Sequence, residues 1–320
     1  MTPHKTQHQQ SVERQSEALR RALGAEILDA LDNPQVIEVM LNPDSTLWID
    51  HLVSGMQKIG RIEPIRALSI IATVAAMRDT VVSPDQPILE CELPLDGSRF
   101  EALIPPLVER PSFALRKKAL RVFTLADYAA QRIITQAQQS AIGHAITARQ
   151  NILVTGGTGT GKTTLANALL DHIAQAAPEH RLVIIEDTRE LQCNAPNAVF
   201  LRTSANTDMT RLLRATLRLR PDRIVVGEVR DGAALALLKA WNTGHPGGVG
   251  TVHANNAGAA LIRIGQLIQE AGVPPNPELI AEAVNIVVSI QRTAGGRAVE
   301  EVAAVRGWSA PGGFNVERLA

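Results

Sequence analysis

The chain has 320 residues, which is more than one hydrophobic core usually supports and therefore favours two domains. Hydrophobic residues make up 45% and charged residues 20%, a composition that excludes a chain disordered throughout. The 32 basic and 32 acidic residues balance, so no global positive field attracts nucleic acid or an anionic membrane. Direct nucleic-acid binding is therefore expected to be weak or confined to a local patch.

Cysteine content and hydropathy predict a cytoplasmic protein. Cys91 and Cys193 alone form neither a disulfide framework nor a four-ligand zinc site, and we expect them to be small buried hydrophobic residues of a reducing cytosol. The polar stretch 1–21 lacks the apolar core of a secretory signal. No apolar run reaches the ~18–20 residues that a membrane span needs.

Residues 1–120 predict a small α+β domain. Its clearest feature is a hairpin that turns at Asp96 and Gly97, because such a dipeptide accepts positive φ. Apolar spacing and the turn signals Ser54–Gly55 and Pro64 indicate the other elements. The expected helices are 11–31 and 64–78, and the expected strands are 47–50, 56–59, 88–94, 99–104 and 112–116.

Residues 121–135 are expected to link this domain to a second one, residues 136–320. Short apolar strands alternate with helices in the second domain, which is typical of a mostly parallel sheet covered on both faces. The expected strands are 152–155, 182–186, 199–202, 224–228 and 250–253. The expected helices are 124–130, 135–148, 163–176, 208–219, 231–241 and 258–271. One more helix and two or three antiparallel strands, such as 299–305 and 314–319, are expected after residue 277.

Residues 156–163 (GGTGTGKT) match the phosphate-binding pattern G-x-x-x-x-G-K-[ST], and on the order of 0.01 matches would occur by chance in a chain of this length. The motif lies between an expected strand and an expected helix, where backbone N–H groups and the helix N-terminus attract phosphate. Lys162 is expected to bridge the β- and γ-phosphates and Thr163 to bind Mg²⁺. The predicted nucleotide contacts are Gly156, Gly157, Thr158, Gly159, Thr160, Gly161, Lys162, Thr163 and Thr164. The sequence therefore predicts that the chain binds a nucleoside triphosphate.

Carboxylates follow two of the expected strands, where α/β sheets bind their ligands. Glu186 and Asp187 end one strand, and Glu228 ends another. One carboxylate is expected to orient or activate water and another to hold Mg²⁺ directly or through water. Glu190 has two open interpretations, a role in catalysis or a simple acid at a helix N-terminus.

A glycine-rich segment, residues 243–250, precedes the expected strand that ends at His253. A histidine at a strand exit can sense a γ-phosphate through a hydrogen bond or couple it to a neighbouring subunit, whereas His245 in the glycine-rich segment is expected to be a surface or interface residue. A metal site from these two histidines is poorly supported, because no cysteine or third histidine lies nearby.

Two groups of arginines are candidates for phosphate or interface contacts. Arg211, Arg214 and Arg218 follow one helix face, a pattern that a solvated face also produces. Arg99 and Arg116 lie in the hairpin and the following strand of the first domain. Either could contact a nucleotide in its own chain or in a neighbouring protomer.

Four segments of the chain together resemble the secretion-system traffic ATPases. Residues 156–163 are similar to their Walker A motif, and residues 97–100 and 112–117 also resemble the family. The glycine-rich segment with Trp241 resembles the conjugation and type IV secretion branch. The segments similar to the Asp box, Walker B motif and His box are 185–191, 217–231 and 250–255.

The resemblance implies a RecA-like P-loop ATPase domain at the C-terminus and a homo-hexameric ring, with ATP and Mg²⁺ bound between the two domains at a subunit boundary. It implies that hydrolysis drives pilus assembly or transfer of DNA or protein, and that the chain is cytoplasmic and peripheral at the inner membrane, bound to inner-membrane components of the apparatus. Arg99 and Arg116 would contact phosphate. The implied catalytic residues are Lys162, Glu186, Glu228 and His253, and the implied Mg²⁺ ligands are Thr163, Asp187 and Glu228.

Three alternatives stay open at this point. A pilus-retraction or type II secretion motor is disfavoured because two distant cysteines cannot supply the four-cysteine zinc module that type II relatives often carry. A RecA-type nucleic-acid motor is disfavoured by the balanced charge and by an aromatic content of only 3%. A nucleotide-gated adaptor without turnover is disfavoured by the complete set of carboxylates.

Overall fold

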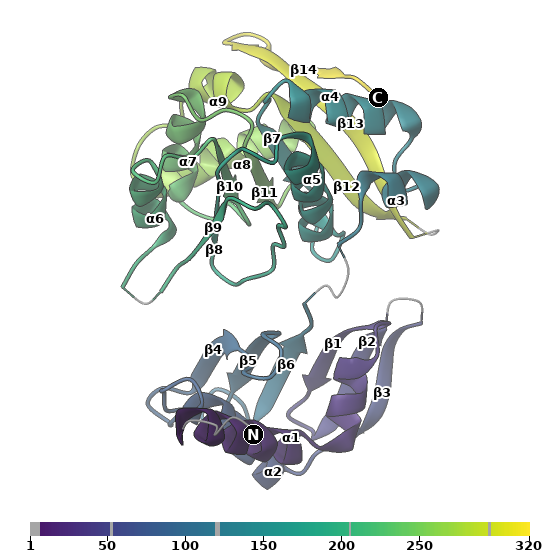
Figure 1. Ribbon diagram of the computed structural model, residues 1–320, viewed down its shortest axis with the longest axis vertical. Helices are drawn as coiled ribbons and strands as arrows, with labels where there is room; N and C mark the ends of the chain where they lie inside the picture. Colours follow the sequence, from purple (N-terminus) through teal and green to yellow (C-terminus); the bar gives the residue numbers. More distant parts are fainter. Residues whose placement is uncertain (1–6, 52–53, 119–121, 205, 294–295) are drawn as a thin grey trace, which may run out of the picture. The chain divides into compact units, whose positions relative to one another are not determined.

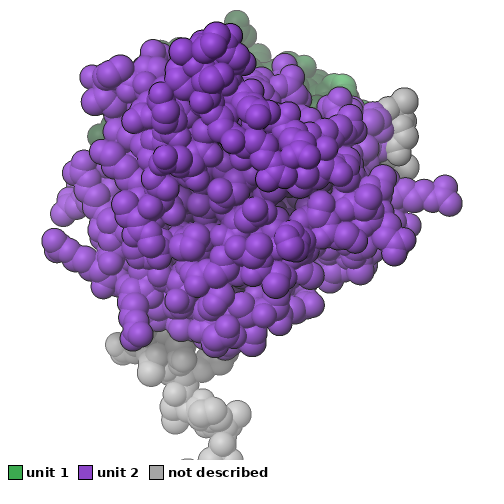
Figure 2. Space-filling model, turned by 90° about the horizontal axis from the view of Figure 1, so that it is seen from above, with its two compact units in different colours: residues 1–120 green, residues 121–320 purple. Residues whose placement is uncertain are grey.

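The chain divides into two compact units, residues 1–120 and residues 121–320, which Figure 2 colours separately. Each unit has a hydrophobic core of its own. The computed structural model describes residues 7–51, 54–118, 122–204, 206–293 and 296–320.

Unit 1 is a six-stranded antiparallel sheet with the strand order β3-β2-β1-β6-β5-β4. Helices α1 (Gln7–Asp32) and α2 (Pro64–Ala76) pack against each other, and α1 contacts β1 (Figure 1). Burial alternates along β5 and β6, so every second side chain enters the core. The strands are β1 (Val36–Leu41), β2 (Thr46–His51), β3 (Gly55–Arg61), β4 (Ile88–Glu92), β5 (Arg99–Leu103) and β6 (Ser112–Arg116).

The structure differs from the sequence prediction of unit 1 in two places. Strand β1, which lies at the centre of the sheet between β2 and β6, was not predicted. The first helix is interrupted at Gly24, which has φ 71°, and the Arg66 guanidinium donates hydrogen bonds to the carbonyls of Ala22 and Leu23 there. The remaining predicted elements are confirmed with small differences at their ends.

Unit 2 is an α/β sandwich around an eight-stranded sheet with the order β14-β13-β12-β7-β11-β10-β8-β9. The strands are β7 (Ile152–Thr155), β8 (Leu182–Glu186), β9 (Ala198–Arg202), β10 (Arg223–Val226), β11 (Val249–Val252), β12 (Ile286–Thr293), β13 (Gly296–Ser309) and β14 (Gly313–Arg318). The helices are α3 (Leu125–Ala130), α4 (Gln136–Thr147), α5 (Lys162–Ala176), α6 (Met209–Thr216), α7 (Ala233–Asn242), α8 (Ala257–Glu270) and α9 (Pro277–Ala283).

Helices cover both faces of this sheet, as the fully apolar strands predicted. One core cluster packs α3, α4 and α5 against alternate strand residues such as Ile152 and Val154, and the other packs α6 to α9 against Leu153 and its neighbours (Figure 1). The strands from β12 to β9 pair in parallel, whereas β13 and β14 extend the sheet antiparallel. Of the strands expected after residue 277, β12 therefore joins the parallel part.

The segment predicted as a linker belongs largely to unit 2. Thr124 and Thr135 cap α3 and α4, each in a capping box that fixes the start of the helix. Leu125, Tyr128 and Ile134 are buried in the same core cluster as α5. These apolar side chains are the physical reason why the segment packs on the sheet rather than acting as a free connection.

Candidate functional site

The P-loop (residues 156–161) leaves β7 at the carboxyl edge of the parallel strands and ends where α5 begins at Lys162. Gly159 and Gly161 adopt positive φ of 70° and 100°, a conformation that residues with a side chain rarely adopt. A Cβ at Gly156 would overlap the Ile290 carbonyl oxygen of β12. The loop therefore needs glycine both for its turns and for its close approach to the neighbouring strand.

Lys162 lies at the centre of the site. Its side chain is 8% exposed, and its ammonium donates hydrogen bonds to the carbonyls of Gly156 and Gly157 at 3.0 and 2.9 Å. The ammonium nitrogen also lies 3.2 Å from Nδ1 of His253, which follows β11. Nε2 of His253 is in turn 3.1 Å from Oε1 of Glu228, which follows β10. The structure thus brings together three of the predicted catalytic residues.

Arg230 completes this cluster from the same turn as Glu228. Its guanidinium donates to Oε2 of Glu228 at 2.7 Å. Burial raises the pKa of Glu228, but the Arg230 hydrogen bond and the charges of Arg230, His253 and Lys162 outweigh it and hold the pKa below its usual value. Glu228 is therefore ionised near neutral pH, as a carboxylate must be to accept a proton from water or to bind a cation.

Glu186 and Asp187, at the end of β8, are held differently. Glu186 is 5% exposed, and its Oε1 accepts the backbone N–H groups of Glu190 and Leu191 at 2.9 and 2.7 Å. Burial raises the pKa of Glu186 to about 7, against the lowering effect of these two hydrogen bonds. Asp187 is exposed and accepts a hydrogen bond from the Thr203 hydroxyl. Glu186 thus lies beneath the turn 187–191 and fixes it.

Asn167 on α5 holds the same turn, a function that was not predicted from the sequence. It is 1% exposed, accepts the N–H of Gln192 at 2.8 Å and donates to the Glu190 carbonyl at 3.4 Å. A polar residue on an otherwise apolar helix face five positions after Lys162 is the signal that could have indicated it. Together, Glu186 and Asn167 fasten the turn that carries Asp187 and Glu190.

The second glycine-rich segment lies at the opposite edge of the sheet, because it precedes β11 whereas the P-loop follows β7. Gly247 and Gly248 donate their N–H groups to Oδ1 of the buried Asn151, and Arg223 donates to the Gly247 carbonyl. A Cβ at Gly248 would overlap the Trp241 indole. This segment is therefore explained by packing, and only His253, at the far end of β11, reaches the P-loop.

Several other sequence predictions concern residues outside this cluster. His245 is half-buried, and its Nδ1 lies 3.3 Å from the Ala240 carbonyl oxygen at the amino edge of the sheet. Arg99 and Arg116 lie in unit 1, directly opposite each other on β5 and β6. Cys91 and Cys193 are free, half-buried thiols that pack against the two cores, so they are less buried than expected.

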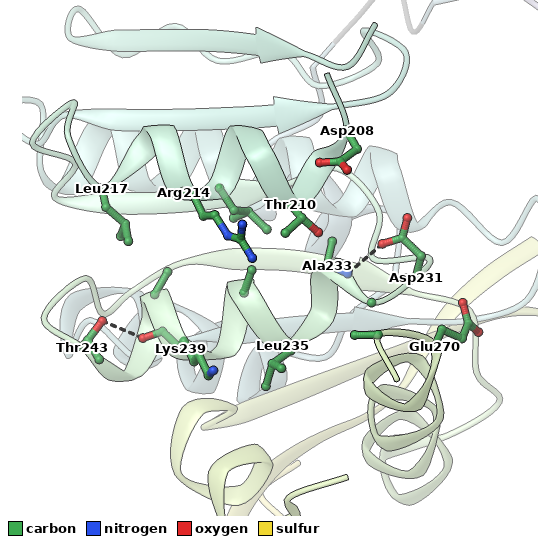
Figure 3. Close-up of a pocket in the computed structure, with 15 residues that line it drawn as sticks. Asp208, Thr210, Arg214, Leu217, Asp231, Ala233, Leu235, Lys239, Thr243 and Glu270 are labelled. Atoms are coloured by element: carbon green, nitrogen blue, oxygen red, sulfur yellow. Dashed lines mark hydrogen bonds between the residues drawn. The ribbon is translucent and has the colours of Figure 1, made fainter. Parts of the chain in front are cut away.

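A groove of about 540 Å³ lies between α6, α7 and the end of α8 (Figure 3). Arg214 of α6 projects into it, with Asp208, Asp231 and Lys239 around the rim. None of the described residues that line it belongs to the P-loop. The groove is thus a separate feature of unit 2, and only one arginine of the predicted stripe contributes to it.

Among the described residues, no group of three or more His, Cys, Asp or Glu side chains is arranged to hold a metal ion. Within the same part of the chain, no helix is both long and apolar enough to cross a membrane.

Comparison with known proteins identifies the family. A family model described as "Type II/IV secretion system protein" matches residues 56–303. A probable conjugal transfer protein TrbB of Sinorhizobium fredii (strain NBRC 101917 / NGR234) is 52% identical over 299 residues, which is 93% of this chain and 92% of the relative. The chain belongs to the type II/IV secretion system protein family.

A more distant relative and two solved structures are also similar to this chain. The type IV secretion system protein VirB11 of Bartonella henselae is 31% identical over 282 residues, 73% of this chain and 78% of the relative. The pilus retraction motor PilT with bound ADP has the same fold, with a TM-score of 0.62 at 20% identity over 87% of this chain and 80% of PilT. The Legionella pneumophila ATPase DotB has a TM-score of 0.61 at 17% identity, over 95% of this chain and 82% of DotB. These likenesses confirm the predicted α/β fold with its P-loop NTPase unit.

Proposed function

We propose that this chain is the ATP-hydrolysing motor of a conjugation or type IV secretion apparatus. The observation that carries the proposal is the contiguous cluster of Lys162, His253 and Glu228 at the P-loop. It joins a phosphate-binding lysine to a histidine and to an ionised carboxylate within hydrogen-bonding distances. The chain's similarity to a probable conjugal transfer protein and to a type IV secretion system protein favours the conjugation and type IV branch.

In this proposal, residues 156–164 hold the phosphates of ATP. Backbone N–H groups of the loop and the N-terminus of α5 bind phosphate oxygens, and Lys162 exchanges its contacts with the loop carbonyls for the β- and γ-phosphates. Because Nδ1 of His253 is 3.2 Å from the Lys162 ammonium, a γ-phosphate that draws Lys162 toward itself also changes the contact with His253. His253 would thereby sense the γ-phosphate.

Glu228 is the residue that we assign to orienting the attacking water. It is ionised, it is half-buried, and its two oxygens are already held by His253 and Arg230, so its orientation is fixed before substrate binds. Glu186, predicted as a second catalytic residue, supports the site instead by holding the turn that presents Asp187 and Glu190.

The side chains present fit Mg²⁺ bound together with nucleotide. The Thr163 hydroxyl and the carboxylates of Asp187 and Glu228 are hard oxygen donors of the kind that Mg²⁺ prefers. When bound, Mg²⁺ supplies charge that neutralises the phosphates.

Assembly and location complete the proposal. The chain would work as a homo-hexamer in the cytoplasm, peripheral to the inner membrane and bound to inner-membrane components of the apparatus. Arg99 and Arg116 of unit 1 would contact phosphate within the assembled ring. Both are available for such a contact, because they lie side by side on one face of the sheet and are only half-buried.

The experiment that tests this function is an ATPase assay on the full chain and on Lys162→Ala, with Lys58→Ala of β3 as a surface control. Lys162→Ala should reduce turnover to background, because the ammonium neutralises phosphate, while the chain stays folded with a somewhat lower melting temperature from the lost hydrogen bonds to Gly156 and Gly157. Turnover like that of the wild type in Lys162→Ala would refute the site. A parallel filter-binding assay that finds tight single-stranded DNA binding would instead favour a nucleic-acid motor.

A further inference from the structure

The β12–β13 hairpin runs along the side of the P-loop that faces away from His253 and Glu228. Strand β12 pairs in parallel with β7 from Ile286 beside Ile152 to Ser289 beside Thr155. β7 stops there and becomes the P-loop, whereas β12 continues to Thr293. The last residues of β12 therefore have the P-loop on the side where β7 has ended, while their other side pairs with β13.

Three P-loop glycines lie close to residues of the β12–β13 hairpin. The Ile290 carbonyl of β12 lies against Gly156. A Cβ added at Gly159 would have the Arg292 guanidinium as its nearest neighbour, at 3.9 Å, and one added at Gly161 would meet the Arg297 side chain at 3.2 Å. Nη2 of Arg297 also donates to the Gly159 carbonyl at 3.4 Å. Two arginines of the hairpin thus border the phosphate-binding loop within the same unit.

These two arginines also lie directly opposite each other. Arg292 of β12 and Arg297 of β13 are antiparallel partners, which places their Cβ atoms about 4.5–5.5 Å apart on one face of the ladder. Like charges at such positions repel each other and destabilise the strand pair. Arg292 is exposed and Arg297 is half-buried. An anion held between the two guanidinium groups would turn this repulsion into attraction.

The strand order indicates which part of a nucleotide reaches them. On one side of β7 lie β11 and β10, which carry His253 and Glu228 beside Lys162, and on the other side lies β12. A nucleotide whose γ-phosphate faces the first group extends its α-phosphate and nucleoside toward the hairpin. We infer that Arg292 and Arg297 bind the α-phosphate and nucleoside end of the nucleotide in cis and set affinity for ATP and ADP alike.

This inference rests on the proposed function, in which the P-loop is the nucleotide site. The test distinguishes a failure of that function from a failure of the arginine contacts. The KM for ATP and the dissociation constant of ADP are measured for the full chain, Arg292→Gln and Arg297→Gln. Arg306→Gln is the control, because Arg306 lies on the same strand as Arg297 but forms an exposed ion pair with Glu317. Absence of ATP and ADP binding in the wild type would defeat the proposed function itself.

If the wild type binds nucleotide, Arg292→Gln and Arg297→Gln should each raise the KM for ATP and the dissociation constant of ADP by about the same factor, roughly tenfold. Both should leave kcat within about twofold of the wild type. Arg306→Gln should match the wild type. A loss for ATP alone would place the arginines at the γ-phosphate and overturn the inference, and unchanged affinity for both nucleotides would also overturn it. A fall in kcat without a change in KM would show a structural effect on the loop and overturn it as well.

The half-buried Arg297 needs a safeguard against a folding defect. Melting temperatures without nucleotide show whether Arg297→Gln is folded, and if it is not, Arg297→Lys takes its place. Arg292→Lys keeps the charge, and it should recover part of the affinity that Arg292→Gln loses. Failure of the lysine variant to recover any affinity for either nucleotide would contradict a charge contact with phosphate.

Discussion

Two glycine-rich segments lie beside strands of the same sheet, in different surroundings. The P-loop follows β7 and is the nucleotide site that we propose. The segment 243–250 precedes β11 and packs against Trp241, Arg223 and Asn151. Because β7 and β11 are parallel, a loop that follows one strand and a loop that precedes the other lie at opposite edges of the sheet.

The difference between the two segments is what their glycines contact. In the second segment, an asparagine side chain accepts the backbone N–H groups of Gly247 and Gly248, and a tryptophan fills the space that side chains would occupy. In the P-loop, the neighbours are the cationic side chains Lys162, Arg292 and Arg297. A glycine-rich sequence thus marks close approach of the backbone. Both segments have a cationic neighbour, but the buried Arg223 guanidinium donates to the carbonyls of Gly247 and Ile146, whereas Arg292 beside the P-loop is exposed to an anionic ligand.

The largest effect that separates the segments should come from Gly248→Ala. The new methyl group would overlap the Trp241 indole and the Ile224 carbonyl, so we expect the free energy of unfolding to fall by roughly 3 kcal/mol or more. Gly244→Ala is the matched control, because Gly244 has φ 98° but open space around it and should cost only about 1 kcal/mol. Chemical denaturation of both variants measures the difference, and equal small losses would show that the second segment is not held by packing.

The next effect concerns the carboxylate beside the P-loop. Glu228→Gln should slow ATP turnover by roughly 10²-fold while nucleotide affinity changes only a few-fold, because the amide cannot accept a proton from water. Steady-state kinetics and direct nucleotide binding measure the two quantities. An equal loss of binding and turnover would make Glu228 a ligand that holds the nucleotide rather than a group that acts on water.

A smaller effect is expected in the pH dependence of stability. The pKa of Glu186 is about 7 in the folded chain, compared with 4.5 for an ordinary glutamate such as that of the unfolded chain. The folded state therefore binds the proton more tightly than the unfolded state does. The contribution of Glu186 to the free energy of unfolding should therefore be fully present below pH ~4.5 and fall by about 2–3 kcal/mol as the pH rises to about 7.

Glu186→Gln tests this prediction, because the amide oxygen still accepts the N–H groups of Glu190 and Leu191 but cannot ionise. Denaturation across this pH range should show a flatter profile for the variant than for the wild type. Parallel profiles would mean that Glu186 is not the group that titrates.

Features set by local sequence were predicted well. Strands β6, β7 and β8 have the predicted bounds, because each is a short run rich in apolar residues between turn signals. The order of P-loop, carboxylates and His253 at successive strand exits was enough to predict the cluster, since parallel strands bring their carboxyl ends to one edge.

Features set by distant contacts were not predicted. The break of α1 at Gly24 depends on Arg66, which is 42 residues away, and the burial of Glu186 depends on a turn that closes over it. The proximity of Arg292 and Arg297 to the P-loop follows from the strand order, which no local pattern in the sequence reveals. The central strand β1 was missed because its apolar residues do not alternate strictly, and a short apolar run without alternation cannot be told from a helical segment by periodicity.

The most direct test of the account is hydrogen–deuterium exchange of the full chain with and without ATP and Mg²⁺. The backbone N–H groups of residues 156–164 should exchange more slowly with nucleotide, because they donate to phosphate, while residues 244–250 should exchange at the same rate in both conditions. Slower exchange in residues 244–250 without any change in residues 156–164 would contradict the assignment of the two glycine-rich segments.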